Sequence, residues 1–237
     1  MRVAVLLTGY ATGYTAQKYG TYADLFRHLL EEPGSTWDTF DVIQGEYPRD
    51  LADYDAYVVT GSASDAHATE PWIQDLNRKL REAFDCGRKI LGVCFGHQAV
   101  ANALGGASHR ADQGWEVGIH ALDLTEAATK KTYGHNLPTN LNVLQTHRDE
   151  VKRLPPGAEL LASSAQTPIQ MYAVGHQVLC MQGHPEYFKD IVSDLLEGRA
   201  LRGLIPEDVA VVARQSLATM EPDRNAFQVM LKTFLYG

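Results

Sequence analysis

Cys94 and His97 stand three positions apart in the segment KILGVCFGHQAV, residues 89–100. A cysteine thiolate is a strong nucleophile, and a histidine base commonly accompanies it. Cys94 lies between Gly92 and Gly96 in the pattern G-x-C-x-G, which has the form of the G-x-S-x-G nucleophile elbow with sulfur in place of oxygen. This pattern predicts a sharp strand-to-helix turn that presents the thiol. We therefore interpret Cys94 as a nucleophile and not as a buried structural cysteine.

The helix expected after Cys94 adds two features to this turn. Its N-terminus points at the thiol, and the positive end of the helix dipole favours the thiolate. The backbone N–H of Phe95 is expected to lie where an oxyanion needs a hydrogen-bond donor. The sequence thus predicts a nucleophile with an oxyanion donor beside it.

Two histidines compete for the role of base. His97 shares a helix face with position 94 through its i, i+3 spacing, but the elbow turns the nucleophile away from the helix axis. His184 follows the apolar segment VLCMQ, and Glu186 comes two residues later, across Pro185. A carboxylate at that spacing can hold one ring nitrogen so that the other faces the thiol, as in a catalytic triad. We expect His184 to be the base, Glu186 its orienting carboxylate and His97 a packing residue behind the nucleophile.

The elements that must position these residues follow from the apolar pattern. In the first half, strands are expected at 2–7, 40–45, 56–60 and 89–94, and helices at 22–32, 71–84 and 96–104. After residue 107, short strands are expected at 115–122, 142–146, 159–164, 169–174 and 178–183, with little room for helices between them. Helices at 187–198, 206–217 and 225–235 close the chain.

This order predicts an α/β fold: a three-layer sandwich around a mostly parallel central sheet, with an antiparallel addition at one edge. We expect one domain over residues 1–237. Ligands in such sheets bind at the carboxyl ends of the strands, where Gly61, Ser62, Cys94 and the residues after Gln182 are expected to meet.

Composition excludes several other classes of protein. The chain has 237 residues, 45% of them apolar, and a formal net charge of −8, which argues against binding to nucleic acids or anionic membranes. There is no run of 18 apolar residues, and MRVAVLL is interpreted as a buried strand and not as a signal peptide. The three cysteines show no CxxC spacing, so neither disulfides nor a metal site is expected. We predict a cytoplasmic protein.

The segments GVCFGHQ (92–98) and QGHPE (182–186) resemble the class I glutamine amidotransferase family, whose fold is flavodoxin-like. The resemblance implies that Cys94, His184 and Glu186 are nucleophile, base and orienting carboxylate. The segment TGS, residues 60–62, matches the oxyanion loop of the family, which implies that the backbone of Gly61 and Ser62 supplies a second donor beside Phe95.

The same resemblance implies a set of substrate contacts. Gln98 matches the glutamine that lies beside the glutamyl end of the substrate. THRDEV, residues 146–151, matches an S-H-x-D segment with Thr146 in place of serine, and makes His147 a candidate substrate-binding residue. Glu116, in a segment that often lines the acyl pocket of the family, could receive the α-amino group of the substrate or could be an exposed strand carboxylate. Tyr10, Tyr14, Tyr19 and Tyr22 could rim the cleft, although packing against the surface is favoured.

Longer segments narrow the resemblance to the plant-type cytosolic γ-glutamyl peptidases: TWDTFDVIQGEYP, YDAYVVTGSASDA, THRDEVKRLPPGAELLASS and EPDRNAFQVMLKTFLYG. This likeness implies hydrolysis of γ-glutamyl amide bonds in small peptides, such as glutathione or its S-conjugates, through a γ-glutamyl thioester on Cys94. The chain has no phosphate-binding G-x-x-x-x-G-K-[ST] loop, so no cofactor and no obligatory synthase partner are expected. The alternatives are a glutaminase subunit that delivers ammonia to a separate synthase and a non-catalytic binding protein.

Overall fold

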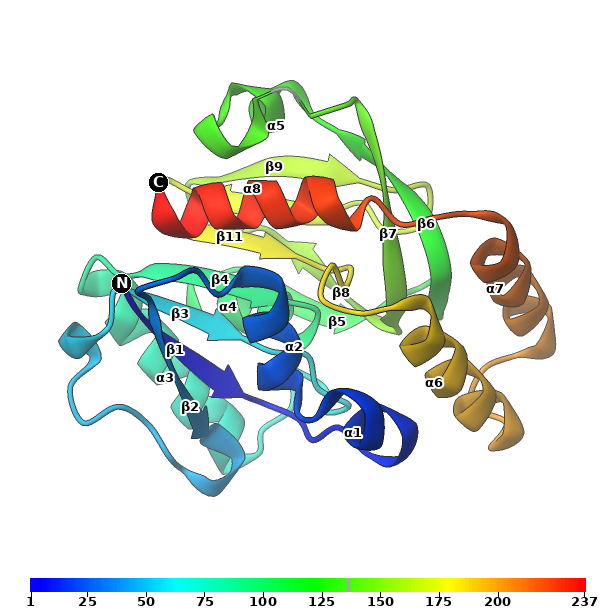
Figure 1. Ribbon diagram of the computed structural model, residues 1–237, viewed down its shortest axis with the longest axis horizontal. Helices are drawn as coiled ribbons and strands as arrows, with labels where there is room; N and C mark the ends of the chain where they lie inside the picture. Colours follow the sequence, from blue (N-terminus) through cyan, green and yellow to red (C-terminus); the bar gives the residue numbers. More distant parts are fainter. Residues whose placement is uncertain (136) are drawn as a thin grey trace.

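The computed structural model describes residues 1–135 and 137–237. In this part of the chain nine strands form one sheet in the order β2-β1-β3-β4-β11-β10-β9-β6-β7 (Figure 1). Five neighbouring strands pair in parallel: β2 (Thr36–Asp41), β1 (Arg2–Leu7), β3 (Ala56–Val59), β4 (Lys89–Val93) and β11 (Val178–Met181). Antiparallel strands extend the sheet beyond β11: β10 (Met171–Val174), β9 (Ala158–Ser163), β6 (Glu116–Leu124) and β7 (Asn140–His147).

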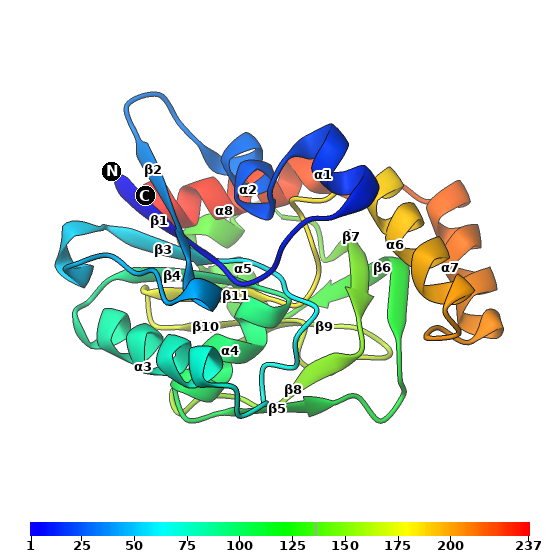
Figure 2. The same cartoon turned by 90° about the horizontal axis from the view of Figure 1, so that it is seen from below.

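Helices cover both faces of the parallel part of the sheet (Figure 2). One face packs against α2 (Tyr22–Leu30) and α8 (Arg224–Tyr236), and the other packs against α3 (Pro71–Asp85) and α4 (Phe95–Ala103). A third group of helices, α6 (Lys189–Leu201) and α7 (Glu207–Thr219), packs against β6 and β7. The short helices are α1 (Gly13–Tyr19) and α5 (Glu126–Lys130).

The central strands are apolar throughout because both of their faces are buried. In β1, Val3 and Val5 face the cluster under α2 and α8, whereas Ala4 and Leu6 face the cluster over α3 and α4. Successive side chains of a strand point to opposite faces, so a strand between two helical layers needs apolar residues at every position. The predicted three-layer α/β fold with an antiparallel edge is confirmed.

The sequence missed several smaller elements. The expected strand at 40–45 is wrong: β2 ends at Asp41, and a 3₁₀ turn follows at Val42–Gln44. The strand stops because the Asp41 carboxylate accepts hydrogen bonds from the N–H groups of Ile43 and Gln44. Helices α1 and α5 were not expected, and neither was a separate two-stranded sheet of β5 (Ala107–Arg110) and β8 (Asp149–Arg153). Within the described residues, no helix is long and apolar enough to cross a membrane.

Candidate active site

Cys94 occupies a strained turn between β4 and α4. Its φ and ψ are 54° and −106°, and among the described residues it is the one non-glycine residue with a positive φ. The turn brings Gly96 against β3, where a Cβ atom would lie 2.4 Å from the carbonyl oxygen of Val59. Only glycine fits there, so the G-x-C-x-G pattern reflects close packing of α4 on the sheet. The elbow expected from the sequence is present.

His184 and Glu186 lie just beyond the end of β11. Nδ1 of His184 donates a hydrogen bond to Oε1 of Glu186 at 2.7 Å, which leaves Nε2 for the neighbouring thiol of Cys94. The imidazole also stacks on Tyr187, with ring centroids 4.1 Å apart and planes 5° apart. The backbone N–H of His184 donates to the carbonyl oxygen of Leu144 at 2.8 Å. The ring is therefore held through a side-chain bond, a stacking contact and its own backbone.

The charge of this histidine follows from its neighbours. Burial alone lowers the pKa of His184, but the negative charge of Glu186 and the interaction with Cys94 outweigh it and raise that pKa to about 10. The site therefore favours the imidazolium form of His184, a charge that would stabilise a thiolate formed beside it.

The segment after β3 places backbone N–H groups beside Cys94. A Cβ atom on Gly61 would lie 3.0 Å from Cε1 of His184 and 3.7 Å from Cβ of Cys94, so the loop passes close to both side chains. The hydroxyl of Thr8 fixes this loop by donating to the carbonyl oxygen of Thr60 at 2.9 Å. In residues 1–135 and 137–237, the backbone N–H groups of Gly61, Ser62 and Phe95 have no hydrogen-bond acceptor. These donors are therefore free to bind an oxyanion.

His97 lies away from the pocket. It is fully buried, its ring packs at 5.0 Å from the ring of Tyr172, and Nδ1 lies 3.2 Å from Oε1 of Gln182. Burial lowers the pKa of His97 to about 3, so the ring is neutral. These contacts match the expectation that His97 packs behind the nucleophile.

Gln98 lines the pocket but has both of its amide hydrogens engaged. Nε2 donates to the backbone oxygen of Asp149 and to Oε1 of Gln182, each at 2.9 Å. Only the carbonyl oxygen of Gln98 remains for a ligand, which it would contact as an acceptor. Gln182 thus holds both Gln98 and His97. The sequence analysis did not identify Gln182, although a polar side chain at the end of an apolar strand could have indicated it.

Glu116 is neither an exposed strand carboxylate nor part of the pocket lining. It is 1% exposed, so the expectation of a solvent-exposed residue is wrong. Its oxygens accept hydrogen bonds at 2.8–2.9 Å from side chains of four residues: His147, Ser164, Thr167 and Gln170. Burial raises the pKa of Glu116. The hydrogen bond from His147 and the charges of nearby histidines have the larger, opposite effect and lower the pKa to about 2. Because Glu116 is buried, bonded to these side chains and absent from the pocket lining, the structure does not bring it to a substrate.

His147 lines the pocket and is fixed by two oxygen atoms behind it. Nε2 faces Oε2 of Glu116 at 2.8 Å, and Nδ1 faces the backbone oxygen of Asp149 at 2.9 Å. The ring is therefore held on both of its nitrogen atoms, which connects the pocket wall to the buried carboxylate of Glu116.

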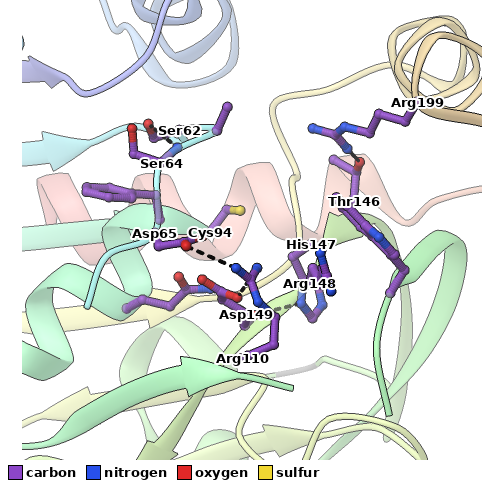
Figure 3. A pocket seen from close by; sticks show the side chains of 14 residues that line it. Ser62, Ser64, Asp65, Cys94, Arg110, Thr146, His147, Arg148, Asp149 and Arg199 are labelled. Carbon is purple, nitrogen blue, oxygen red and sulfur yellow. Dashed lines mark hydrogen bonds and ion pairs between the residues drawn. The ribbon is translucent and has the colours of Figure 1, made fainter. Parts of the chain in front are cut away.

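The pocket in front of Cys94 includes residues that the sequence analysis did not identify (Figure 3). Arg199, from α6, donates a hydrogen bond to Oγ1 of Thr146, and its guanidinium lies 5.0 Å from the centroid of the Trp115 ring. Arg110 enters from β5. These side chains are distant in sequence from the Cys94 and His184 motifs, and no local pattern marked them.

Asp65, His67 and Asp149 form, within the described chain, the one group whose ligand atoms are close enough to share a metal ion. Arg110 already occupies this group: Nη1 lies 2.6 Å from Oδ1 of Asp149, and Nη2 lies 2.9 Å from Oδ2 of Asp65. Burial and then the charge of Asp65 raise the pKa of Asp149. A metal ion would have to displace the guanidinium, so the arrangement fits an arginine with two carboxylate partners better than a metal site.

Four tyrosines near the end of β1 lie outside the pocket lining: Tyr10, Tyr14, Tyr19 and Tyr22. The hydroxyls of Tyr14 and Tyr19 donate to Asp190 of α6 at 2.6 and 2.8 Å, and Lys18 pairs with the same carboxylate. These contacts fasten α1 to α6, in agreement with packing at the surface for Tyr14 and Tyr19. Tyr22 packs instead against Tyr187, with ring centroids 5.9 Å apart.

Comparisons with known proteins show similarity in sequence and in fold. The family model for glutamine amidotransferase class-I matches residues 26–191. γ-Glutamyl peptidase 4 of Arabidopsis thaliana is 36% identical over 94% of this chain and 90% of its own length, and γ-glutamyl peptidase 5 is 35% identical over 100% and 96%. A solved glutamine amidotransferase from Thermotoga maritima, 19% identical, shares the fold with a TM-score of 0.75 over 100% of this chain and 98% of that chain.

Proposed function

Because the chain belongs to the class I glutamine amidotransferase family, we propose that it is a hydrolase of γ-glutamyl amide bonds in small peptides such as glutathione, with Cys94 as nucleophile. One observation carries this proposal: the thiol at the elbow lies beside the ring of His184, which Glu186 holds in turn. The names of the relatives that match nearly the whole chain support the γ-glutamyl group as the acyl part of the substrate.

The proposed reaction is acyl transfer to water in two steps. The Cys94 thiolate attacks the δ-carbonyl carbon of the γ-glutamyl group, and the N–H groups of Gly61, Ser62 and Phe95 bind the resulting oxyanion. His184 gives its proton to the leaving amine, and a γ-glutamyl thioester remains on the sulfur. The now neutral His184 accepts a proton from water, the hydroxide attacks the thioester, and glutamate leaves as the thiolate re-forms.

We propose that the chain works without a synthase partner and within the cytoplasm as one domain. Hydrolysis of a γ-glutamyl peptide releases an amine that needs no further site, whereas an amidotransferase must pass ammonia to a second active site. Two γ-glutamyl peptidases match this chain over at least 90% of both sequences, and this similarity supports hydrolysis without a synthase partner. A glutaminase subunit is the competing function, because the family model is named for glutamine amidotransfer.

The test is glutamate release by the purified chain alone from glutathione, γ-glutamylcysteine and glutamine. We expect faster release from the peptides than from glutamine, and a loss of roughly 10³-fold or more in Cys94→Ala. Cys86→Ser is the matched control, because Cys86 is an exposed free cysteine at the end of α3. Cleavage of glutamine only, and only with an added partner, would show that the chain is a glutaminase subunit.

A further inference from the structure

Arg199 projects from the last turn of α6 into the pocket that contains Cys94 (Figure 3). Its guanidinium is oriented by the hydroxyl of Thr146, which accepts a hydrogen bond from Nη1, and by the ring of Trp115 at 5.0 Å. Arginine carries five N–H donors, so most of them remain for a ligand. The side chain is thus fixed in direction while its donor capacity is largely unused.

The charge of Arg199 has no acidic partner among the residues that the structure describes. Within residues 1–135 and 137–237, no carboxylate lies within 4.0 Å of its guanidinium, whereas Arg110 in the same pocket pairs with both Asp65 and Asp149. Burial lowers the pKa of Arg199, which reflects the loss of hydration of the cation. A partly buried cation without a counterion is costly, so an anion that enters the pocket is favoured.

We propose that Arg199 binds a carboxylate of the substrate, an inference that rests on the proposed function. The planar guanidinium fits a carboxylate through two parallel hydrogen bonds, and a lysine cannot reproduce this geometry. A γ-glutamyl peptide offers two such groups: the α-carboxylate of the glutamyl residue and the terminal carboxylate of the leaving peptide. Recognition at Arg199 therefore selects γ-glutamyl compounds that carry the bound carboxylate over compounds in which that carboxylate is an amide.

Three substrates separate the two sources of the carboxylate. γ-Glutamyl-glycine carries both carboxylates, γ-glutamyl-glycinamide lacks the terminal one, and the α-carboxamide of γ-glutamyl-glycine lacks the glutamyl one. The wild type should prefer the parent compound over one of the two amides by roughly 10- to 100-fold in kcat/KM. The amide that is discriminated against identifies the carboxylate that Arg199 binds.

Arg199→Met should abolish that preference and leave the response to the other amide unchanged, and Arg199→Lys should retain only part of it. Arg202→Met is the matched control, because Arg202 is exposed at the end of the same helix and donates to the backbone oxygen of Gly198. It should keep the wild-type preference. Equal preferences in the wild type and Arg199→Met would overturn the proposal, as would a wild type with no preference.

A binding measurement keeps this inference separate from the proposed function. Calorimetric titration of γ-glutamyl-glycine into Cys94→Ala, with and without Arg199→Met, requires no turnover. If the wild type hydrolyses none of the peptides but Arg199→Met weakens binding by roughly 10-fold or more, the proposed function fails and the carboxylate site stands. If turnover occurs and binding is the same in both proteins, the carboxylate site fails alone. If neither protein binds the peptide, the carboxylate site is wrong.

Discussion

At the scale of single residues, the charge state of His184 decides what Cys94 can do. Two environments oppose each other at this ring: burial, which disfavours the imidazolium, and the adjacent Glu186 and Cys94, which favour it. The carboxylate is itself 1% exposed, so little water screens its charge from the ring 2.7 Å away. Glu186 therefore favours the imidazolium form of His184 beside the thiol of Cys94.

Glu186→Gln should move the alkaline limb of kcat/KM to lower pH, because the pKa of His184, about 10, falls when the carboxylate is removed. The turnover number should fall by roughly 10²–10⁴.

The same pKa shift affects the free energy of unfolding. Because the pKa of His184 is raised in the folded state, its contribution to stability is fully present at pH values below the ordinary pKa of 6.5 and is lost as the pH rises through about 10. Denaturant unfolding at both ends of that range should show a smaller pH-dependent loss in the variant.

The control for this prediction is Glu221→Gln, which removes an exposed carboxylate paired with Lys189. It should leave the pH–rate profile as in the wild type. An alkaline limb at the same pH in Glu186→Gln and the wild type would mean that Glu186 does not set the charge of His184.

The sequence predicted the residues of this site where a short motif marks them. Cys94, His184 and Glu186 were predicted as a group because the elbow and the His-Pro-Glu segment are local patterns, and the structure brings the three together. The positions of Arg199 and Glu116 relative to the pocket could not be predicted in this way. Arg199 reaches the pocket because α6 packs on β7. Glu116 lies outside the pocket because β6 pairs with β7, which places Glu116 opposite His147. Their roles depend on tertiary pairing, which spacing along the chain does not reveal.

At the scale of elements, the contact of α4 with β3 joins the turn at Cys94 to the loop at Gly61. Gly96 lies in the first turn of α4, and a side chain there would meet the backbone of Val59, two residues before Gly61. The distance between the thiol of Cys94 and the backbone N–H groups of Gly61 and Ser62 thus depends on one close approach of helix and strand. Backbone atoms on both sides leave little room for relaxation.

Gly96→Ala should lower the free energy of unfolding by about 2 kcal/mol or more, because its Cβ would lie 2.4 Å from the carbonyl oxygen of Val59. Gly198→Ala is the matched control, since an added Cβ there meets nothing within 4 Å. That change, inside α6, should stabilise the chain by about 0.5–1 kcal/mol. Denaturant unfolding measures both; a Gly96→Ala protein as stable as the wild type would contradict the packing argument.

Elements were predicted best where an apolar face had to be buried. The helix at 71–84 and the strand at 89–94 show continuous patterns, and the structure places α3 and β4 there within a residue. Helix α1 has no apolar stripe and is held by polar contacts of Tyr14, Lys18 and Tyr19 with Asp190, 171–176 residues away in sequence. Contacts at that separation are invisible to a periodicity argument.

At the scale of the whole molecule, the pocket lies between the two parts of the sheet. The parallel strands supply Cys94 and Ser62, whereas the antiparallel strands and the helices packed on them supply Thr146, His147 and Arg199. His184 follows β11, the strand at which the two parts meet. A ligand in the pocket therefore contacts both parts at once and should couple their stability.

Binding of γ-glutamyl-glycine to Cys94→Ala should therefore raise the midpoint of one cooperative thermal transition. At a ligand concentration about 100 times Kd, the stabilisation is about 2.7 kcal/mol, which corresponds to roughly 5–10 °C for a chain of this size. Differential scanning calorimetry measures the shift, and glycylglycine, which lacks the γ-glutamyl group, is the control ligand that should leave the midpoint unchanged. Two separate transitions, of which the ligand moves only one, would show that the parallel and antiparallel parts unfold independently and that the pocket belongs to one of them.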